Sequence, residues 1–433
     1  MSTERVDVLV VGAGPAGLAA ATELRRRSAG RVLVLDRERQ AGGIPRHSDH
    51  QGYGLIDLHR PLTGPQYARR MTRAALDSGA ELRLETSVVS WAGERRVCTT
   101  SAAGVGEIEA AAIVLASGCR ERPRSARLVP GTRPAGIFTT GSLQQFVHIH
   151  HVPVGRRAVV VGAEHVSFSA VLTLAHAGVR VVALVTEHPR HQTYPPLKLV
   201  TTDARGIPIL AGQKVSAIKG GRRVEAVEVA DVATGAVQTL SCDTVVFTGD
   251  WIPDHELARL AGVAIDPGTK GPRVDGALRT SAPGVFAAGN LLHGAETSDI
   301  ATGEGRHVAS AVDDWLATGA WPSGWVRISV ADPLTWVTPN AITPGSGALP
   351  SRPFVLRVNH FVPRPTVEIR QGTRLLWRGR PTSGFLASFA PWLPGPAVHG
   401  ALVPGRPVHV PTQWTGDVRA ADEPVVISVA EEV

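Results

Sequence analysis

The chain begins with a strand, a glycine-rich turn and a helix in immediate succession. Residues 7–11 are apolar enough for a buried strand, residues 12–17 read Gly-Ala-Gly-Pro-Ala-Gly, and residues 18–27 form a predicted helix. A second predicted strand, 31–35, ends at Asp36. This order is that of a βαβ unit, which opens a parallel sheet with helices on its faces. The start of the chain therefore predicts an α/β fold that binds a nucleotide.

Each residue of the turn suits a phosphate-binding site. Gly12 allows the tight change of direction from strand to helix, Gly14 lets a pyrophosphate approach the backbone, and Gly17 lets the helix pack closely on the sheet. Pro15 and Ala16 are part of the turn, and the N-terminus of the helix that follows supplies unpaired N–H groups and a dipole that attract phosphates. The acidic residue that ends the second strand stands where a carboxylate accepts hydrogen bonds from a ribose diol. Strand, turn, helix and acid together predict a dinucleotide site.

Length and composition favour a soluble protein of several domains. The 433 residues suggest two to three domains, and 43% hydrophobic against 19% charged residues indicate a sizeable buried core rather than disorder. The longest apolar runs, such as 179–185, are strand-sized and too short for a membrane span. A buried-strand pattern begins almost at residue 1, so no signal peptide is expected. We expect a soluble, cytoplasmic protein without a transmembrane segment.

Charge and cysteine content argue against several classes of protein. The net charge of +7 comes from arginines scattered among acidic neighbours, and aromatic residues are only 5%. A nucleic-acid binder would gather its basic residues into a stripe with stacking aromatics, so nucleic acid is not an expected partner. Cys98, Cys119 and Cys242 lie far apart without a C-x-x-C motif. This spacing excludes a zinc ribbon, an iron–sulfur site within the chain and a thioredoxin-type redox pair.

Two later segments point to the kind of dinucleotide. Residues 280–290 read as a turn, a short buried strand and a polar residue, before a helix predicted from about Thr302 to Trp315, and residues 113–118 form another strand and turn. With the first glycine turn, they resemble the FAD-binding elements of flavoproteins with two dinucleotide-binding domains. That family includes the pyridine nucleotide–disulfide oxidoreductases and relatives without the disulfide. The resemblance covers about residues 5–320 and implies noncovalently bound FAD.

The resemblance also implies the architecture. The expected fold class is α/β, with a discontinuous Rossmann-like FAD domain, an inserted second Rossmann-like domain and a β-rich C-terminal extension. The expected boundaries are 1–135 and 246–322 for the two parts of the FAD domain, 150–245 for the inserted NAD(P)-type domain and 325–433 for the extension. The extension contains short alternating runs, such as 354–358 and 366–370, that are typical of small β-structures. Its expected use is to dock a partner or a second copy, or only to cover the FAD domain.

A narrower likeness follows from further motifs. Residues 41–50, 52–55, 62–65, 133–144 and 289–293 are similar to one branch of the family. The branch contains FAD subunits of multi-component dehydrogenases and oxidases, of the hydrogen cyanide synthase, opine oxidase and dye-linked proline dehydrogenase type, and proteins encoded beside glycerol-3-phosphate dehydrogenase. The implied activity is electron transfer from a small amine, amino acid or polyol through flavin to another subunit.

The likeness implies a set of cofactor-binding residues. The set is Gly12, Gly14, Pro15, Ala16, Gly17, Asp36, Arg37, Gly43, Val88, Ala116, Ser117, Gly118, Gly289 and Asn290. Asn290 replaces the Asp usual in the disulfide reductases, and its neutral amide can still hydrogen-bond the ribityl chain or the pyrophosphate. His293 is expected close to the flavin ring, and Glu296 and Asp299, in the loop before the following helix, are either substrate-side acids or caps. The positive end of that helix would favour anionic reduced flavin.

A histidine pair near the expected flavin site supplies the candidate for catalysis. His47 and His50 follow Gly42 and Gly43, which should pass near the isoalloxazine ring. His50 is the candidate general base for a C–H or N–H substrate, or a donor to the flavin. Alternatively, both histidines only line the pocket or bond to backbone. Relatives in the narrower branch often carry Cys at the position of Ser48, so a thiol role is not expected.

The inserted domain has the layout of a second dinucleotide site with an altered turn. The turn reads Gly162-Ala-Glu164-His-Val-Ser167, and a strand after the next helix ends before Glu187. Glu164 brings bulk and charge to the position where a pyrophosphate touches backbone. NAD(P) could still bind with Glu164 turned away and Glu187 on the ribose. We favour the alternative that the domain has lost nucleotide binding.

A second histidine cluster, His148-Ile-His-His151, has two imidazoles that could share a helical face. No cysteine accompanies them, and two imidazoles without a third ligand make a poor transition-metal site. We therefore assign no metal site.

These observations predict an FAD-dependent oxidoreductase, an electron-transferring subunit of a multi-component dehydrogenase or oxidase. Its partners would be a small-molecule substrate and a partner subunit or further copies of itself. One alternative is an NAD(P)H-dependent reductase that passes electrons through FAD to a protein or quinone. Another is a structural FAD-binding subunit with catalysis in a partner chain.

Overall fold

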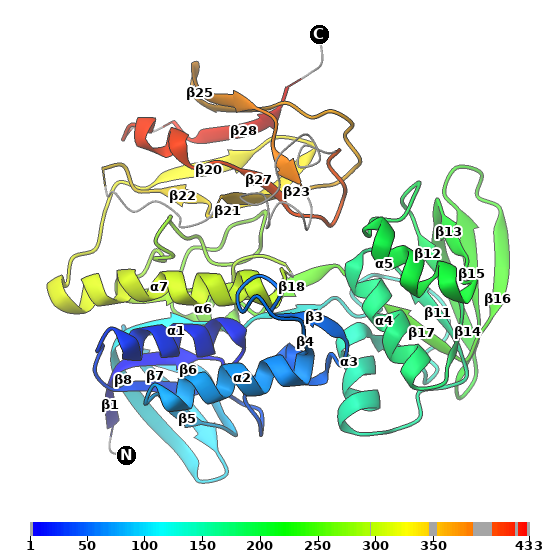
Figure 1. Ribbon diagram of the computed structural model, residues 1–433, viewed down its shortest axis with the longest axis horizontal. Helices are drawn as coiled ribbons and strands as arrows, with labels where there is room; N and C mark the ends of the chain where they lie inside the picture. The colour runs from blue at the N-terminus through cyan, green and yellow to red at the C-terminus, as the bar shows by residue number, and fades with distance from the viewer. Residues whose placement is uncertain (1–2, 295, 346–352, 384–400, 421–422, 431–433) are drawn as a thin grey trace.

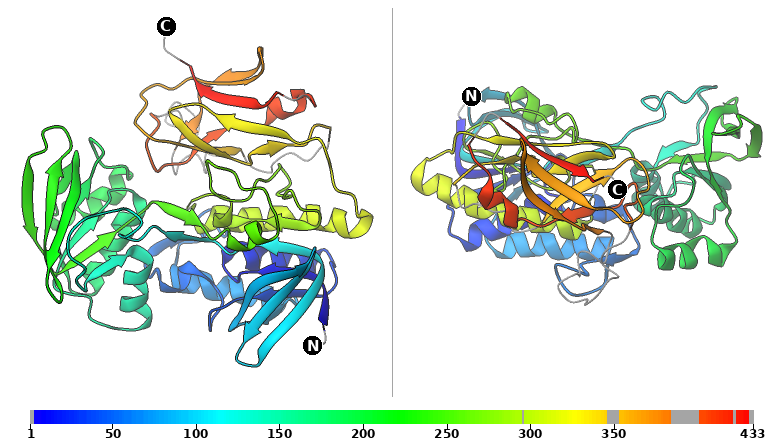
Figure 2. Two further views of the ribbon diagram at one scale, coloured as in Figure 1. Left: turned by 180° about the vertical axis from the view of Figure 1, so that it is seen from behind. Right: turned by 90° about the horizontal axis from the view of Figure 1, so that it is seen from above.

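The structure is a computed structural model that describes residues 3–294, 296–345, 353–383, 401–420 and 423–430. Figure 1 shows three parts: a first unit built around α1 and α7, an inserted unit beside it, and a β-rich C-terminal module above α7. The two views of Figure 2 agree with this arrangement. Among the described residues, no helix is both long and apolar enough to cross a membrane.

The first unit contains a seven-stranded sheet that draws on two distant parts of the chain. The strands run in the order β5-β2-β1-β8-β7-β6, and β19 also pairs with β8. Their bounds are β1 Thr3–Val11, β2 Val32–Leu35, β5 Glu81–Arg83, β6 Thr86–Gly93, β7 Arg96–Ser101, β8 Gly104–Leu115 and β19 Val285–Ala287. The first half of β8 pairs antiparallel with β7, and its last three residues, Ile113–Leu115, pair parallel with β19. The predicted discontinuous Rossmann-like fold is thereby confirmed.

Three long helices belong to the first unit: α1 Pro15–Arg26, α2 Gly64–Asp77 and α7 Ser298–Thr318. The helix α1 begins three residues before the predicted start, because Pro15 already fits the first helical turn. The predicted bounds of α7 were wrong at both ends. It begins at Ser298, so Asp299 lies in its first turn instead of in the preceding loop, and it ends at Gly319 in the left-handed conformation, with φ +64°.

The inserted unit has its own parallel sheet. The order is β10-β17-β11-β12-β13, with bounds β10 Ile137–Thr139, β11 Arg157–Val161, β12 Arg180–Thr186, β13 Ile209–Ala211 and β17 Thr244–Phe247. Its helices are α3 Thr140–Gln144, α4 His165–His176 and α5 Pro195–Thr201, and an antiparallel sheet of β14 Gln213–Gly220, β15 Val224–Asp231 and β16 Val237–Ser241 adjoins it. The parallel sheet starts with β10, ahead of the residue 150 at which we expected the inserted domain to begin.

The chain crosses between the two units twice, and the crossings pair with each other. The strand β9, Cys119–Glu121, leaves the first sheet, and β18, Trp251–Pro253, returns from the second. They form a two-stranded antiparallel ladder, followed by the short helix α6, Glu256–Leu260. The loop region after β2 holds the hairpin strands β3 Gln51–Tyr53 and β4 Leu62–Thr63.

The C-terminal module consists of two sheets with a core of their own, which confirms the predicted β-rich extension. One sheet has the order β22-β20-β28-β24-β25 and the other β21-β23-β27-β26. The bounds are β20 Val326–Val330, β21 Leu334–Thr338, β22 Ala341–Ile342, β23 Phe354–Val358, β24 Val367–Gln371, β25 Arg374–Gly379, β26 Thr382–Ser383, β27 Val408–Val410 and β28 Val425–Val429. Phe354 and Trp414 pack in this core at a ring-centroid distance of 5.0 Å.

Candidate functional site

The first glycine turn joins β1 to α1 in a conformation that only small residues allow. Gly12 has φ +112°, and a Cβ atom there would lie 2.4 Å from the Ala116 carbonyl oxygen. A Cβ at Gly17 would lie 1.9 Å from the carbonyl oxygen of Gly12. At Gly14, by contrast, a Cβ would meet nothing within 4 Å, so the backbone there is open to a ligand. This open, positively polarised turn fits the pyrophosphate of FAD.

The carboxylate of Asp36 holds the end of β2 against this turn. Its Oδ2 accepts a hydrogen bond from the Ala13 N–H at 2.7 Å, and its Oδ1 accepts one from the Glu38 N–H at 2.9 Å. Each carboxylate oxygen can accept more than one hydrogen bond, so lone pairs remain for a ribose diol. Arg37 follows with an exposed side chain. The position therefore suits the adenosine half of the cofactor.

Further candidate residues surround the turn. A Cβ at Gly43 would lie 2.9 Å from the Cα of Gly14, so the backbone at residue 43 touches the turn from one side. After β8, the Ala116 N–H donates to the Val11 carbonyl at 2.8 Å, which keeps residues 116–118 against β1. Val88, another predicted cofactor-binding residue, is half-buried in β6.

The segment after β19 meets the start of α1. A Cβ at Gly289 would lie 2.6 Å from the Cβ of Ala16, and the Gly289 N–H donates to Glu304 Oε2 at 2.8 Å. The Asn290 amide faces the loop before α7: its Nδ2 donates to the Glu296 carbonyl at 3.3 Å, and its Oδ1 accepts from the Glu296 N–H at 3.1 Å. Asn290 thus shapes the loop at the entry of α7.

Glu304, on α7, was not predicted as a site residue. Besides the Gly289 backbone, it contacts Nε2 of the fully buried His293 at 3.0 Å. Burial lowers the pKa of His293, but the charge and hydrogen bond of Glu304 outweigh it, so the pKa is raised. Sequence spacing gave no signal for Glu304, because its partners are brought to it by tertiary folding.

The C-terminal module also reaches this part of the first unit. Arg357, from β23, forms an ion pair with Glu296 in which the side chains are 9% and 2% exposed. The guanidinium lies 5.0 Å from the ring centroid of Trp336, and that ring stacks on His293 at 5.9 Å. Glu296, expected to be a substrate-side acid or a cap, is therefore neutralised by a residue of the module.

Two buried aspartates meet at the start of α7. The Asp57 N–H donates to Asp299 Oδ1 at 3.4 Å, and Tyr67 donates to Asp57 Oδ2 at 2.9 Å while contacting Thr302 Oγ1 at 2.6 Å. Burial, together with the hydrogen bond and charge of Asp57, raises the pKa of Asp299 to about 8. Arg306 lies 3.5 Å from Asp57 Oδ2 and supplies positive charge. The sequence identified only Asp299 of this group as a candidate site residue, because its partners come from the distant 57–67 segment.

The two candidate histidines, which follow Gly43 in the chain, lie in different environments. His47 is buried, and burial together with the Arg46 charge lowers its pKa to about 4. The ring of His50 contacts Ser48 Oγ through Nε2 at 3.1 Å and the Gln51 carbonyl through Nδ1 at 2.8 Å. The catalytic assignment of His50 stays a prediction. Its bond to the Gln51 carbonyl fits the alternative that the ring only bonds to nearby backbone.

In the inserted unit, Glu164 folds over its own turn. Its Oε2 would be 2.7 Å from a Cβ at Gly162, and its Oε1 would be 2.8 Å from a Cβ at Gly249. The Oε1 atom is buried without a hydrogen-bond partner among the described residues. The third position, Ser167, is fully buried and hydrogen-bonds Thr248 Oγ1 at 2.7 Å. The carboxylate thus stands where a pyrophosphate would approach the backbone.

The remaining cysteines and histidines form no second redox or metal centre in the described part of the chain. Cys98, Cys119 and Cys242 all lie within it, and none is joined in a disulfide. His148 lies 5.0 Å from the ring of His176, whereas His151 follows at φ +52°. The described ranges contain no group of three or more His, Cys, Asp or Glu residues placed to hold a metal ion.

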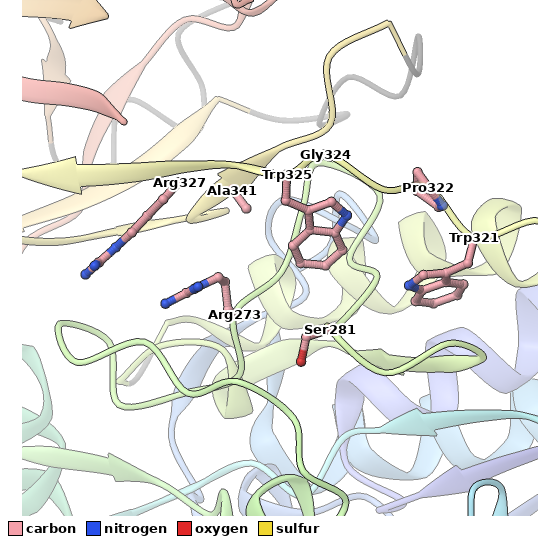
Figure 3. Close-up of a pocket in the computed structure, with 8 residues that line it drawn as sticks. All are labelled: Arg273, Ser281, Trp321, Pro322, Gly324, Trp325, Arg327 and Ala341. Carbon is pink, nitrogen blue, oxygen red and sulfur yellow. The ribbon is translucent and has the colours of Figure 1, made fainter. Parts of the chain in front are cut away.

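A separate pocket of about 340 Å³ lies where the first unit meets the C-terminal module. It is lined by Arg273, Ser281, Trp321, Pro322, Gly324, Trp325, Arg327 and Ala341. Figure 3 shows the Arg273 and Arg327 side chains extending in the same direction. No predicted site residue lines this pocket, so it is distinct from the glycine-turn site.

The chain is similar to known oxidoreductases over its first three quarters. It is 28% identical to thioredoxin reductase of Treponema pallidum over 72% of this chain and 97% of that protein. It is 27% identical to one subunit of the opine oxidase of Agrobacterium tumefaciens over 68% of this chain, but it spans only 63% of that relative. The crystal structure of T. acidophilum thioredoxin reductase matches with a TM-score of 0.61 and 22% identity, over 72% of this chain and 98% of that one.

Residues 6–308 match the family described as pyridine nucleotide-disulphide oxidoreductase. The match contains both glycine turns and the Gly289–Asn290 segment, and enzymes of this family use FAD and NAD(P). The predicted resemblance to flavoproteins with two dinucleotide-binding domains is confirmed. The chain therefore belongs to the pyridine nucleotide-disulphide oxidoreductase family and is an FAD-dependent oxidoreductase.

Proposed function

We propose that the protein is the FAD-containing subunit of a multi-component dehydrogenase or oxidase that acts on a small amine, amino acid or polyol. The observation that carries the proposal is the carboxylate of Glu164, folded over the inserted turn between Gly162 and Gly249. A fixed negative charge there repels a pyrophosphate, which disfavours NAD(P)H as the source of electrons. The similarity to one component of opine oxidase supports a substrate-oxidising role.

FAD, when bound, would supply the electron acceptor for the substrate. The residues of this chain would hold it: the turn at Gly14 its pyrophosphate, Asp36 its ribose, and the start of α7 the flavin end. Asp57 and Asp299 share a buried site next to Tyr67, and the raised pKa of Asp299 lets it hold a proton near neutral pH. We further propose the expected division into an FAD domain (1–135 and 246–322), an inserted domain (150–245) and an extension (325–433), with β10 and the last residues of β17 added to the inserted domain because both strands belong to its sheet.

The spacing of the cysteines supports electron transfer from the flavin to an acceptor without a dithiol intermediate. A reductase that works through a dithiol needs two neighbouring thiols, and Cys98, Cys119 and Cys242 lie far apart in the sequence without a C-x-x-C motif and form no disulfide in the described ranges. We therefore propose that electrons pass to a partner subunit, and we place the function in a complex. Its location would be the cytoplasm.

The test uses the purified holoprotein under anaerobic conditions. Amines, amino acids and glycerol phosphates are added with an artificial electron acceptor, and flavin absorbance and dye reduction are followed. We expect at least one substrate class to bleach the flavin while NADH and NADPH do not. Bleaching by NADH within seconds, without any response to the substrates, would instead support the NAD(P)H-dependent reductase. A response to neither donor, with or without a partner subunit, would leave the structural FAD-binding role as the better assignment.

A further inference from the structure

The segment after β12 lies where a dinucleotide would cross the inserted sheet, and the C-terminal module covers it. Parallel sheets of this kind bind ligands beyond the carboxyl ends of their strands. Arg406 of the module donates from Nε to the Gln192 carbonyl at 2.6 Å and from Nη2 to the Thr193 carbonyl. Its guanidinium also lies 4.4 Å from the ring centroid of Tyr194. One arginine therefore binds three consecutive residues of the segment.

A second contact lies closer to the end of β12. Phe361 of the module has its ring centroid 4.3 Å from the guanidinium of Arg190 and 6.1 Å from the ring of His188. His188 is half-buried, and this burial lowers its pKa. These residues flank Glu187, the acid that we expected on the ribose of a bound nucleotide.

The third contact reaches the altered glycine turn itself. A Cβ at Gly405 would lie 3.7 Å from the Cβ of Glu164 and 3.8 Å from Nε2 of Gln192. The Gln192 N–H in turn donates to the Ala163 carbonyl at 2.9 Å, which ties the covered segment to the turn. The module thus lies next to the second position of the turn, where a pyrophosphate would have to approach.

The module is also attached to the first unit. Asn340 Oδ1 accepts from the Val274 N–H at 2.9 Å, and the buried Arg357–Glu296 pair lies beside the His293 ring stack. The module therefore bridges the two nucleotide-type units, in addition to the paired crossings β9 and β18.

We propose that residues 401–407 and Phe361, which we name the cap, close the dinucleotide site of the inserted unit and fix that unit against the first one. The cap occupies the approach to the turn, and the Glu164 carboxylate occupies the turn itself. NAD(P)H then has no route to a flavin bound in the first unit. The inference rests on the proposed function in one respect: if NAD(P)H cannot reach the flavin, the electrons must come from another substrate.

A disulfide tests the predicted proximity directly. Glu164→Cys and Gly405→Cys would place two Cβ atoms about 3.7 Å apart, and disulfides need about 3.5–4.5 Å. We expect the holoprotein of the double variant to form an intramolecular cross-link under mild oxidation, detected by peptide mass spectrometry. The matched control combines Glu164→Cys with Gly324→Cys, because Gly324 has the same φ of +77° as Gly405 and a Cβ there would meet nothing within 4 Å. If both new thiols of the Glu164→Cys and Gly405→Cys double variant can still be alkylated after oxidation, the proposal is overturned.

Nucleotide binding tests the closure with different residues. NADH affinity is measured by fluorescence titration for the wild type, for Glu164→Gly, and for Glu164→Gly combined with Phe361→Ala and Arg406→Ala. We expect the triple variant to bind NADH at least tenfold more tightly than Glu164→Gly alone. Arg378→Ala, on an exposed part of the module with a 58% exposed side chain, replaces the two cap substitutions in the control. A triple variant that binds no better than Glu164→Gly, or a wild type that binds NADH as tightly as the triple variant, would contradict the closure.

The two proposals fail in different ways. Retention of FAD, read from the flavin spectrum, shows that each variant is folded. Oxidation of amines, amino acids and polyols with a dye acceptor is measured on the same preparations. If the wild type oxidises none of these substrates, the proposed function is rejected, but the cross-link result still stands. If the cross-link does not form, only the proposed cap is rejected.

Discussion

The backbone N–H of Asp57 points at the carboxylate of Asp299, at 3.4 Å. The Asp57 side chain is 0% exposed and Asp299 as a residue is 2% exposed, so two acids share one buried site. Two carboxylates in such a place cannot both ionise cheaply. Burial and the neighbouring Asp57 accordingly raise the pKa of Asp299 from 3.8 to about 8. Below that pH, the pair holds a proton beside the start of α7.

This proton makes stability depend on pH. An aspartate whose pKa is higher in the folded state binds more protons there than in the unfolded chain, so its contribution is complete below pH 4 and is lost as the pH rises toward 8. We expect Asp299→Asn to remove this downward trend and to raise the melting temperature at pH 8. Thermal unfolding between pH 4 and 9 measures it, and Asp314→Asn, on the exposed side of the same helix, is the control. An unchanged trend in Asp299→Asn would contradict the shared proton.

The glycine turn can be tested without disturbing the fold. Gly14 has φ −79° and open space around it, so Gly14→Ala adds a methyl group without strain but places it where a pyrophosphate would lie. We expect FAD affinity to fall by about 10- to 100-fold, which corresponds to roughly 1–3 kcal/mol of steric conflict. Equilibrium dialysis of the apoprotein with FAD measures it. Gly416→Ala, at an equally open position of the C-terminal module, should bind FAD normally.

The ion pair between Arg357 and Glu296 should matter far more than those on the surface. Removing one partner of a buried pair leaves an uncompensated charge, so Arg357→Ala should lower the free energy of unfolding by about 3–5 kcal/mol. Arg378→Ala removes a pair to Glu368 whose arginine is 58% exposed, and it should cost no more than about 1 kcal/mol. Urea unfolding of both variants distinguishes the outcomes. Equal losses would mean that the Arg357 pair is hydrated in solution.

Glu304 should control the protonation of His293. Without the carboxylate, burial of the ring and the Arg357 charge lower the pKa, and only the charge of Glu296 opposes them. We expect the pKa of His293 to lie above 6.5 in the wild type and to fall below it in Glu304→Gln. Titration of the imidazole signal by NMR, with labelled histidine, follows this change. Glu94→Gln, whose side chain is 90% exposed, should leave the signal where it is.

Local geometry explains which parts of the site could be predicted. The roles of Gly12 and Gly17 follow from contacts within one βαβ unit, and each lies where a Cβ atom has no room. The start of α7 could also have been read, because Thr297 can serve as an N-cap ahead of Asp299 in the first turn. Contacts such as Arg406 with Gln192 leave no such trace, because each partner is an ordinary loop residue until the tertiary fold brings them together.

The pairing of β8 has a consequence for synthesis on the ribosome. The last three residues of this strand, Ile113–Leu115, gain their second neighbour only from Val285–Ala287, which follow the whole inserted unit. At typical elongation rates, this part of the strand waits about 10–30 s with one edge unpaired. An unpaired edge is a template for wrong pairing with other chains. Nascent-chain aggregation should therefore be highest just before residue 285 leaves the exit tunnel.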